Sequence, residues 1–177
     1  MAVGGRSSSG KTTMAGRLAT VIPGSVVVHT DDIAWRHAVL DWDDLLRTGV
    51  LEPTRRGRAV AYRLPRWEEY GRPGAVVVPA GARALIVEGV GATRRTLAPL
   101  LDATVLVQAD AAELARRNEA RIAVGETTPA DHRAWMAEEG PFRLDDRARE
   151  RASVIVAGTP ELPDDPEAEA VAANSPV

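Results

Sequence analysis

A glycine- and serine-rich run near the start of the chain has the composition and spacing of a phosphate-binding loop. Residues 5–12 read Gly-Arg-Ser-Ser-Ser-Gly-Lys-Thr and match the pattern G-x-x-x-x-G-K-[ST]. In this pattern backbone N–H groups close around a phosphate, the lysine reaches the phosphate oxygens, and the hydroxyl that follows it binds Mg²⁺. A serine-rich turn without a ligand is the alternative. The residues expected to bind ATP are Gly5, Ser7, Ser8, Ser9, Gly10, Lys11, Thr12 and Thr13.

The single lysine of the chain falls inside this run. Lysine and arginine together number 22, and Lys11 is the one lysine among them. A compact ammonium on a flexible stem differs chemically from a guanidinium, so a general preference for arginine does not explain Lys11. This supports a role for Lys11 in phosphate transfer.

Carboxylates follow two of the apolar segments. Asp31 and Asp32 come directly after Ser25–His29, and Glu88 closes the apolar run Leu85-Ile86-Val87. A phosphoryl acceptor needs a group that orients its hydroxyl and takes the proton, and Mg²⁺ prefers oxygen ligands. Glu88 could be an ordinary charge at a strand end, but a carboxylate that closes a buried strand needs a partner. We therefore expect Glu88 to join Thr12 at a metal site.

Three motifs together resemble the uridine kinase and nicotinamide riboside kinase family. They are the loop Gly-x-Ser-x-Ser-Gly-Lys-Thr-Thr, the Asp-Asp pair with an aromatic residue soon after it, and a strand that ends in Glu-Gly. The resemblance covers most of residues 1–158 and is loose between the motifs. It implies that Asp31 is the general base, that Asp32 helps to hold the hydrated metal or the acceptor, and that Glu88 acts on Mg²⁺ directly or through water. The sequence departs from the family at Ile33-Ala34-Trp35, where Phe-Tyr or Phe-Phe is usual.

The resemblance also implies a lid of arginines over the phosphates. Arg116, Arg117 and Arg121 follow the expected fourth strand of the central sheet. Arg117 and Arg121 share one helix face, so we expect this pair to be catalytic. A solvated basic face paired with nearby glutamates is the alternative.

Aromatic residues gather in one part of the chain, between positions 35 and 70, close to the expected base. Their clustering predicts stacking walls for a flat or ringed acceptor, and packing of a small insert onto the sheet is the alternative. The residues expected to bind the acceptor are Asp31, Trp35, Trp42, Tyr62, Arg63 and Trp67.

The apolar pattern predicts alternating strands and helices. Continuous apolar runs are typical of parallel strands covered on both faces. We expect strands at 1–3, 25–29, 84–87, 103–108 and 153–156, with a further β-branched run at 75–79. Helices are expected at 11–20, 41–48, 110–124, 128–138 and 143–152, with Gly49 closing the second helix.

This alternation predicts one α/β domain over residues 1–160, with a mostly parallel five-stranded sheet. Together with the loop motif, this predicts the three-layer fold of P-loop nucleoside triphosphatases (NTPases). An acceptor-binding insert is expected at about residues 36–74 and a helical lid at about 116–130. Residues 161–177 lack apolar periodicity and are expected to be disordered.

Composition excludes several classes of function. The formal charge of −3 argues against a protein that coats nucleic acid, and the absence of cysteine excludes disulfides and thiolate metal sites. We expect a cytoplasmic protein without membrane spans, a monomer or homodimer whose partner is a small-molecule acceptor.

The predicted function is an ATP- and Mg²⁺-dependent phosphotransferase that moves the γ-phosphate to a hydroxyl of a nucleoside-like or other small ringed metabolite. A nucleotide-binding sensor or switch is the alternative. The guanine-reading motif Asn-Lys-x-Asp is excluded because Lys11 is the only lysine. The sequence leaves the acceptor open, and also the choice between ATP and GTP.

Overall fold

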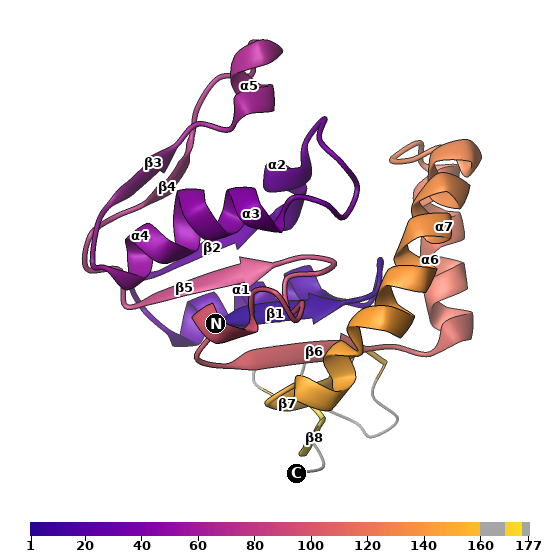
Figure 1. The fold of residues 1–177 in the computed structure, drawn as a ribbon. Helices are drawn as coiled ribbons and strands as arrows, with labels where there is room; N and C mark the ends of the chain where they lie inside the picture. Colours follow the sequence, from indigo (N-terminus) through magenta and orange to yellow (C-terminus); the bar gives the residue numbers. More distant parts are fainter. Residues whose placement is uncertain (160–168, 175–177) are drawn as a thin grey trace.

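The computed structural model describes residues 1–159 and 169–174. Its centre is a sheet in the order β2-β5-β1-β6-β7-β8, in which the first five strands are parallel (Figure 1). This confirms the predicted α/β class and the five parallel strands. The five strands are β1 (Ala2–Gly5), β2 (Ser25–His29), β5 (Ala84–Glu88), β6 (Thr104–Gln108) and β7 (Val154–Ala157).

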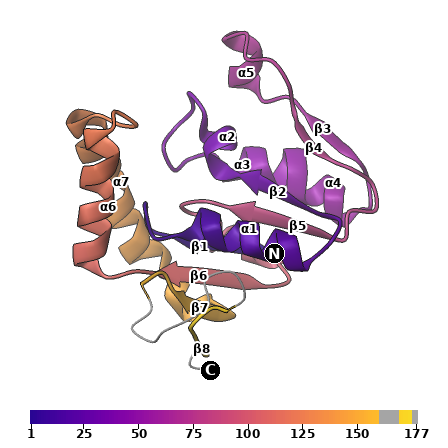
Figure 2. The ribbon, with the colours of Figure 1, turned by 180° about the vertical axis from the view of Figure 1, so that it is seen from behind.

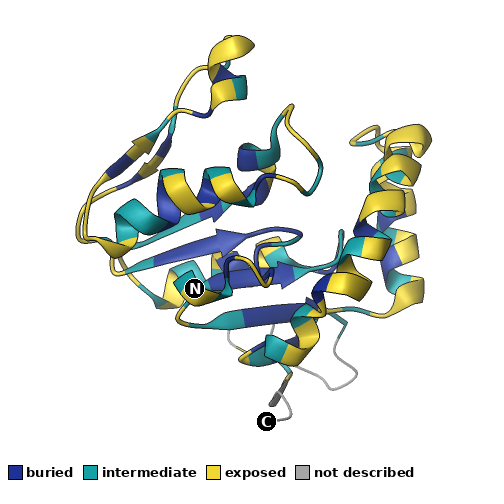
Figure 3. Ribbon diagram, in the orientation of Figure 1, coloured by how far each residue is buried: buried dark blue, intermediate teal, exposed yellow. Residues whose placement is uncertain are grey.

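The central strands are apolar throughout because both faces of the sheet are covered. In β5, Ile86 packs with Ala15 of helix α1 (Lys11–Val21), while Leu85 and Val87 join the apolar cluster on the opposite face. Helix α1 lies behind the sheet in Figure 1 and in front of it in Figure 2. The buried colour of β1, β5 and β6 in Figure 3 follows from this double covering.

Strand register brings the expected acidic residues to one edge of the sheet. His29 and Val3 both lie opposite Glu88, so β2 and β5 end together, and β1 continues two residues further to Gly5 and the phosphate-binding loop. Helix α2 (Thr30–Ala34) begins immediately after β2. At this crossing a Cβ on Gly89 would overlap the Thr30 side chain, so only glycine fits after Glu88.

The insert differs from the prediction at its helix. The chain continues from α3 (Asp43–Leu46) through a π-helical turn (Arg47–Leu51) into α4 (Glu52–Arg55), and Gly49 does not end the helix at residue 48. A Cβ at Gly49 would overlap the ring of Tyr62, so this glycine serves a close approach of two segments.

The β-branched run at 75–79 forms a strand, and this strand belongs to the insert. Strand β4 (Val76–Val78) pairs antiparallel with β3 (Val60–Tyr62) in a separate two-stranded sheet, and α5 (Pro65–Glu69) lies between these strands. The insert therefore extends past the predicted end near residue 74, to Val78.

Two long helices form the other side of the molecule. They are α6 (Ala111–Ala123) and α7 (Pro129–Asp146), here called the lid helices (Figure 1). The prediction of separate helices at 128–138 and 143–152 was wrong, because α7 continues through Pro141 and a 3₁₀ turn (Ala148–Arg151) follows it. Burial of Glu139 and the contact of Phe142 with Arg94 hold the helix on both sides of the proline.

Residues 169–174, near the end of the chain, are among the described residues. The predicted disordered tail, 161–177, falls mostly outside the described residues, but Ala172–Asn174 form strand β8 antiparallel to β7, which corrects the prediction at these positions. A short 3₁₀ turn (Ala98–Leu100) precedes β6. Within the described ranges, no helix is both long and apolar enough to cross a membrane.

The packing of β4 predicts opposite results for two adjacent valines. Val78 is 0% exposed and belongs to the main apolar cluster, whereas Val77 is 58% exposed. We expect Val78→Ala to lower the free energy of unfolding by about 2 kcal/mol, from lost burial and the cavity left behind. The matched control Val77→Ala should change it by less than about 0.5 kcal/mol. Urea unfolding followed by circular dichroism measures both, and equal losses would contradict the packing of this sheet on the core.

Candidate active site

A cleft of about 1030 Å³ lies between the phosphate-binding loop, the strand ends and the lid helices. It brings together residues that the sequence predicted separately, from four elements of the fold. Gly5 and the buried Ser9 lie in the same loop but do not line the cleft. The predicted residues that line it are Ser7, Ser8, Gly10, Lys11, Thr12, Thr13, Asp31, Glu88, Arg117 and Arg121.

The loop and the start of α1 fit an anion. Gly10 precedes α1 with φ of +96°, no side chain caps this helix end, and no acidic residue lies in its first turn. The first N–H groups of the helix are therefore left for an external acceptor, and the positive end of the helix dipole faces the same place. Among the described residues, the buried Ser9 hydroxyl also has no hydrogen-bond partner.

Glu88 is the centre of a short polar chain. Its side chain is nearly buried, the Thr12 hydroxyl donates to Oε1 at 3.0 Å, and His29 Nδ1 lies 2.7 Å from Oε2. A hydroxyl and a carboxylate oxygen side by side at a phosphate site fit a hard cation such as Mg²⁺. No cluster of three or more His, Cys, Asp or Glu is formed by the described residues, so phosphate oxygens or water would complete such a site. The sequence did not reveal the contact of His29 with Glu88.

Lys11 lies in an acidic environment within the cleft. Burial lowers its pKa, the carboxylates of Glu88, Asp31 and Glu139 oppose this shift, and Arg121 adds to it. Its ammonium donates to the carbonyl of Arg6 at 3.3 Å. The lysine is thus held by the loop close to the residues expected to handle phosphate and acceptor.

Helix α6 holds the phosphate-binding loop. Arg117 Nη1 donates to the Ser8 carbonyl at 3.1 Å, Arg121 Nη1 lies 3.4 Å from Ser7 Oγ, and the Ser8 hydroxyl donates to Asn118 at 2.6 Å. Arg116 forms an exposed ion pair with Glu113 instead. The predicted pair Arg117 and Arg121 is therefore the one in contact with the loop.

Helix α7 reaches the same loop through a residue that the sequence analysis missed. Glu139 is 0% exposed, accepts from the Ser7 backbone N–H at 3.1 Å through Oε1, and accepts from the Trp135 indole at 2.9 Å through Oε2. Trp135 also lines the cleft. The i,i+4 spacing of these two residues was visible in the sequence, but the predicted break at residue 138 hid it.

The two adjacent aspartates have different surroundings. Asp31 lines the cleft and contributes to the charge around Lys11, whereas the Asp32 carboxylate lies 2.5 Å from Arg72, and its carbonyl accepts from the Trp67 indole. Neighbours on a helix point about 100° apart, and both aspartates lie in α2. The structure does not bring Asp32 to Thr12 and Glu88, and it joins Asp32 to the insert instead.

The predicted tryptophans of the acceptor site do not line the cleft. Trp42 is buried beneath Arg94, and Trp67 is buried with Arg72 stacked on its ring at 3.8 Å. Trp35 carries Arg36 and Arg72 within 5.4 Å and 5.1 Å of its ring centre. Their ring faces are used inside the insert because a small lobe needs apolar area to pack.

Tyr62 and Arg63 are also outside the cleft. Tyr62 packs on Gly49 at a separate shallow depression, and Arg63 donates to the Gly74 carbonyl at 3.0 Å on the exposed side of the insert. Of the predicted acceptor residues, the structure brings Asp31 alone to the cleft.

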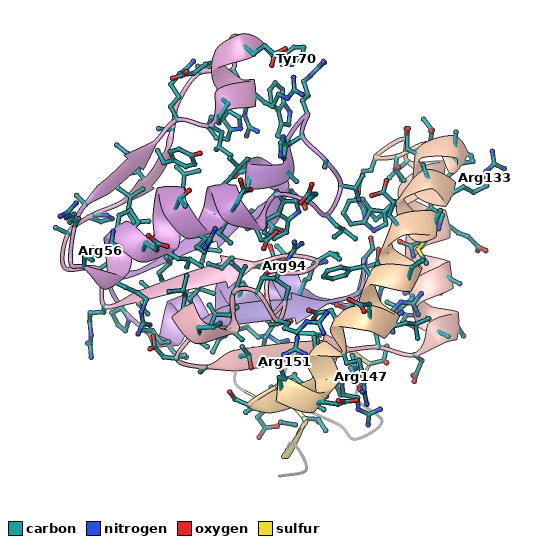
Figure 4. All side chains as sticks on the ribbon, viewed as in Figure 1. Arg56, Tyr70, Arg94, Arg133, Arg147 and Arg151 are labelled. Carbon is teal, nitrogen blue, oxygen red and sulfur yellow. The ribbon has the colours of Figure 1, made fainter. Side chains whose placement is uncertain are left out.

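Arg94 connects the loop after β5, the insert and helix α7. Its role was not predicted from the sequence. It is almost fully buried, pairs with Asp43 at 3.0 Å, and lies over the rings of Trp42 and Phe142. It therefore ties the loop after β5 to the insert and to α7, and Figure 4 shows it between them.

Comparisons with known proteins identify the architecture. No family model matches the chain, and no curated protein matches it. A solved structure described as a "Possible Uridine Kinase from Bacillus stearothermophilus" has 18% sequence identity and a TM-score of 0.58, over 87% of this chain and 85% of that chain. The chain has a P-loop kinase fold.

A second solved structure is less similar to this P-loop kinase fold. It is described as a "putative fructose transport system kinase from Silicibacter sp. TM1040", with 23% identity and a TM-score of 0.47 over 85% of this chain and 84% of that chain. At these identities the likeness concerns the fold, and the reaction has to be argued from the site.

The contact between Ser8 and Asn118 gives a prediction for the site. Asn118 is buried on α6, while its neighbour Glu119 is exposed. We expect Asn118→Ala to lower the free energy of unfolding by about 0.5–1.5 kcal/mol, because the half-buried hydroxyl of Ser8 loses its acceptor. The control Glu119→Ala should change it by less than about 0.5 kcal/mol. Chemical denaturation without nucleotide is the measurement, and an unaffected Asn118→Ala would show that the Ser8–Asn118 bond does not stabilise the fold.

Proposed function

We propose that the chain is a small-molecule kinase that uses ATP and Mg²⁺ to phosphorylate a hydroxyl of a nucleoside-like or other ringed acceptor. The observation that carries the proposal is the Thr12–Glu88 hydrogen bond, in one cleft with Lys11 and Asp31. A phosphate loop alone would fit many nucleotide-binding proteins. Two candidate Mg²⁺ ligands, Thr12 and Glu88, beside the separate carboxylate of Asp31 support transfer to an acceptor.

Different residues of the cleft would bind the phosphates and the metal ion. The N–H groups of the loop, the Lys11 ammonium and Arg121 would hold the phosphates of ATP, and Thr12 with Glu88 would hold Mg²⁺. Magnesium would supply neutralisation of negative charge at the phosphates. Arg117, held at the Ser8 carbonyl, would add positive charge from the lid.

Asp31 would act on the acceptor. Its carboxylate would orient the hydroxyl and receive the proton as the acceptor oxygen bonds to the γ-phosphorus. The bond from phosphorus to the bridging oxygen breaks in the same step, and ADP leaves. Asp32 would act through its pair with Arg72, by holding the insert beside Asp31.

The direct test is ADP release by purified protein with Mg-ATP across nucleosides, ribosides, sugars and ring-containing natural products. We expect turnover with one acceptor class, and we expect Asp31→Asn to lower kcat by about 10²–10⁴. ATP binding should persist in this variant, because Asp31 makes no contact with the loop backbone in the described hydrogen bonds. ATP binding without acceptor-dependent turnover in the wild-type protein would favour a sensor or switch.

The proposed role of Thr12 and Glu88 as Mg²⁺ ligands predicts that a substitution at Thr12 changes the Mg²⁺ dependence of ATP binding. Thr12→Val keeps the shape of the side chain but removes the hydroxyl that bonds to Glu88, whereas Thr12→Ser keeps it. We expect Thr12→Val to weaken the Mg²⁺-dependent part of ATP affinity by at least about tenfold. Thr12→Ser should restore most of it. Titration calorimetry with Mg²⁺ and with EDTA separates the two, and an equal response to Mg²⁺ in all three proteins would remove Thr12 from the metal site.

A further inference from the structure

The cleft contains one aromatic side chain whose ring faces are not used elsewhere. In the part of the chain that the structure describes, the other three tryptophans each have an arginine stacked on the ring. Trp135 has no such contact there and belongs to none of the apolar clusters, and it lines the cleft half-buried. An aromatic face that is neither packed in the core nor stacked by a cation is available to a ligand.

Trp135 lines the same cleft as Asp31 and is tied to the phosphate-binding loop. Its indole N–H is bound by Glu139, which also binds the N–H of Ser7 at the start of the loop and contributes to the charge around Lys11. Asp31 acts on the same lysine.

Glu139 gives Trp135 a fixed position relative to the phosphate-binding loop. Its two oxygens are used by two different partners, Ser7 N–H at 3.1 Å and Trp135 Nε1 at 2.9 Å, and the carboxylate is fully buried. A buried carboxylate that loses either donor carries a free-energy cost, so both donors stay in place. The indole and the loop are therefore held by one group.

We propose that Trp135, on lid helix α7, is the residue that stacks on a flat ring of the acceptor, and that Glu139 is the positioning residue that couples this stacking to the phosphate-binding loop. The inference rests on the proposed kinase function. It assigns recognition of the acceptor ring to the lid, whereas the clustering of aromatic residues in the sequence predicts it in the insert. The acceptor class is an alcohol with a planar ring. The insert supplies Asp31 with its support, and α7 supplies the ring face.

The test uses uridine, adenosine and nicotinamide riboside as ring probes, with ribose as the probe without a base ring. Each is titrated into the full chain with Mg²⁺ and the non-hydrolysable analogue AMP-PNP, and AMP-PNP is titrated separately. We expect at least one ring probe to bind more tightly than ribose, and Trp135→Leu to weaken that probe about tenfold, as loss of a stacking surface does. Trp135→Phe should recover most of the affinity, and in both variants AMP-PNP binding should change much less than binding of the ring probe.

Trp35→Leu is measured in parallel because it removes the competing ring of the insert. A loss in Trp35→Leu without a loss in Trp135→Leu would overturn the inference, and so would a loss of AMP-PNP affinity alone in Trp135→Leu. Binding of AMP-PNP with no ring probe bound by the wild-type protein would also overturn it, yet leave the kinase proposal standing. Failure of Mg-AMP-PNP itself to bind would count against the kinase proposal.

The role of Glu139 has its own readout. In the wild-type protein we expect Mg-AMP-PNP to tighten binding of the ring probe by at least about fivefold, and the ring probe to tighten AMP-PNP equally, because linkage is reciprocal. In Glu139→Gln an NH₂ group, which cannot accept, takes the place of one of the two oxygens, so one of the two N–H groups loses its acceptor and this coupling should disappear. Coupling that persists in a folded Glu139→Gln protein would show that Glu139 is structural alone.

Discussion

The site depends on one buried carboxylate. Glu88 ends a strand that is apolar over its whole length, and an isolated charge there would be costly, so its two oxygens are held by Thr12 and His29. These contacts fix the start of α1 and the end of β2 relative to β5. The positions of Lys11 and Asp31 follow, because Lys11 is the residue before Thr12 and Asp31 is two residues after His29.

The lid helices are hydrogen-bonded directly to the phosphate-binding loop and do not merely cover it. Arg117, Arg121 and Asn118 contact the loop from α6, and Glu139 contacts it from α7. Ser8 at the centre of these contacts has φ of +64°, which is uncommon for a residue with a side chain and is held by its neighbours. Movement of the lid therefore has to change the hydrogen bonds of the loop, which gives the two parts a physical connection.

The sequence could predict what depends on short-range pattern. The loop motif, the parallel strands and the acidic residues at their ends follow from residue types at fixed spacing, and the structure brings Lys11, Thr12, Asp31 and Glu88 together. Continuous apolar strands reveal burial on both faces, so the fold class was also predictable. The antiparallel pairing of β4 was not, because its apolar run reads like that of a central strand.

The features that could not be predicted depend on the direction in which a side chain points and on contacts with residues far away in the sequence. Asp31 and Asp32 are adjacent, but the turn of α2 sends Asp32 to Arg72. The clustered tryptophans resemble ligand-binding surfaces in the sequence, but in the structure arginines distant in the sequence lie over the rings of Trp35 and Trp42. Gly49 was expected to end a helix, and Pro141 lies between two segments expected to be separate helices, yet the chain is helical at both positions. Gly49 packs on Tyr62, and Arg94 lies over the ring of Phe142, the residue after Pro141.

The most direct measurement is a crystal structure of the chain with AMP-PNP and Mg²⁺. The account predicts the β- and γ-phosphates at the N–H groups of residues 8–12, and Mg²⁺ bound to the Thr12 hydroxyl and to Glu88 directly or through water. Lys11 should then leave the carbonyl of Arg6 for the phosphates. Phosphates bound away from the loop, or a metal ion without contact to Thr12 and Glu88, would contradict the central claim.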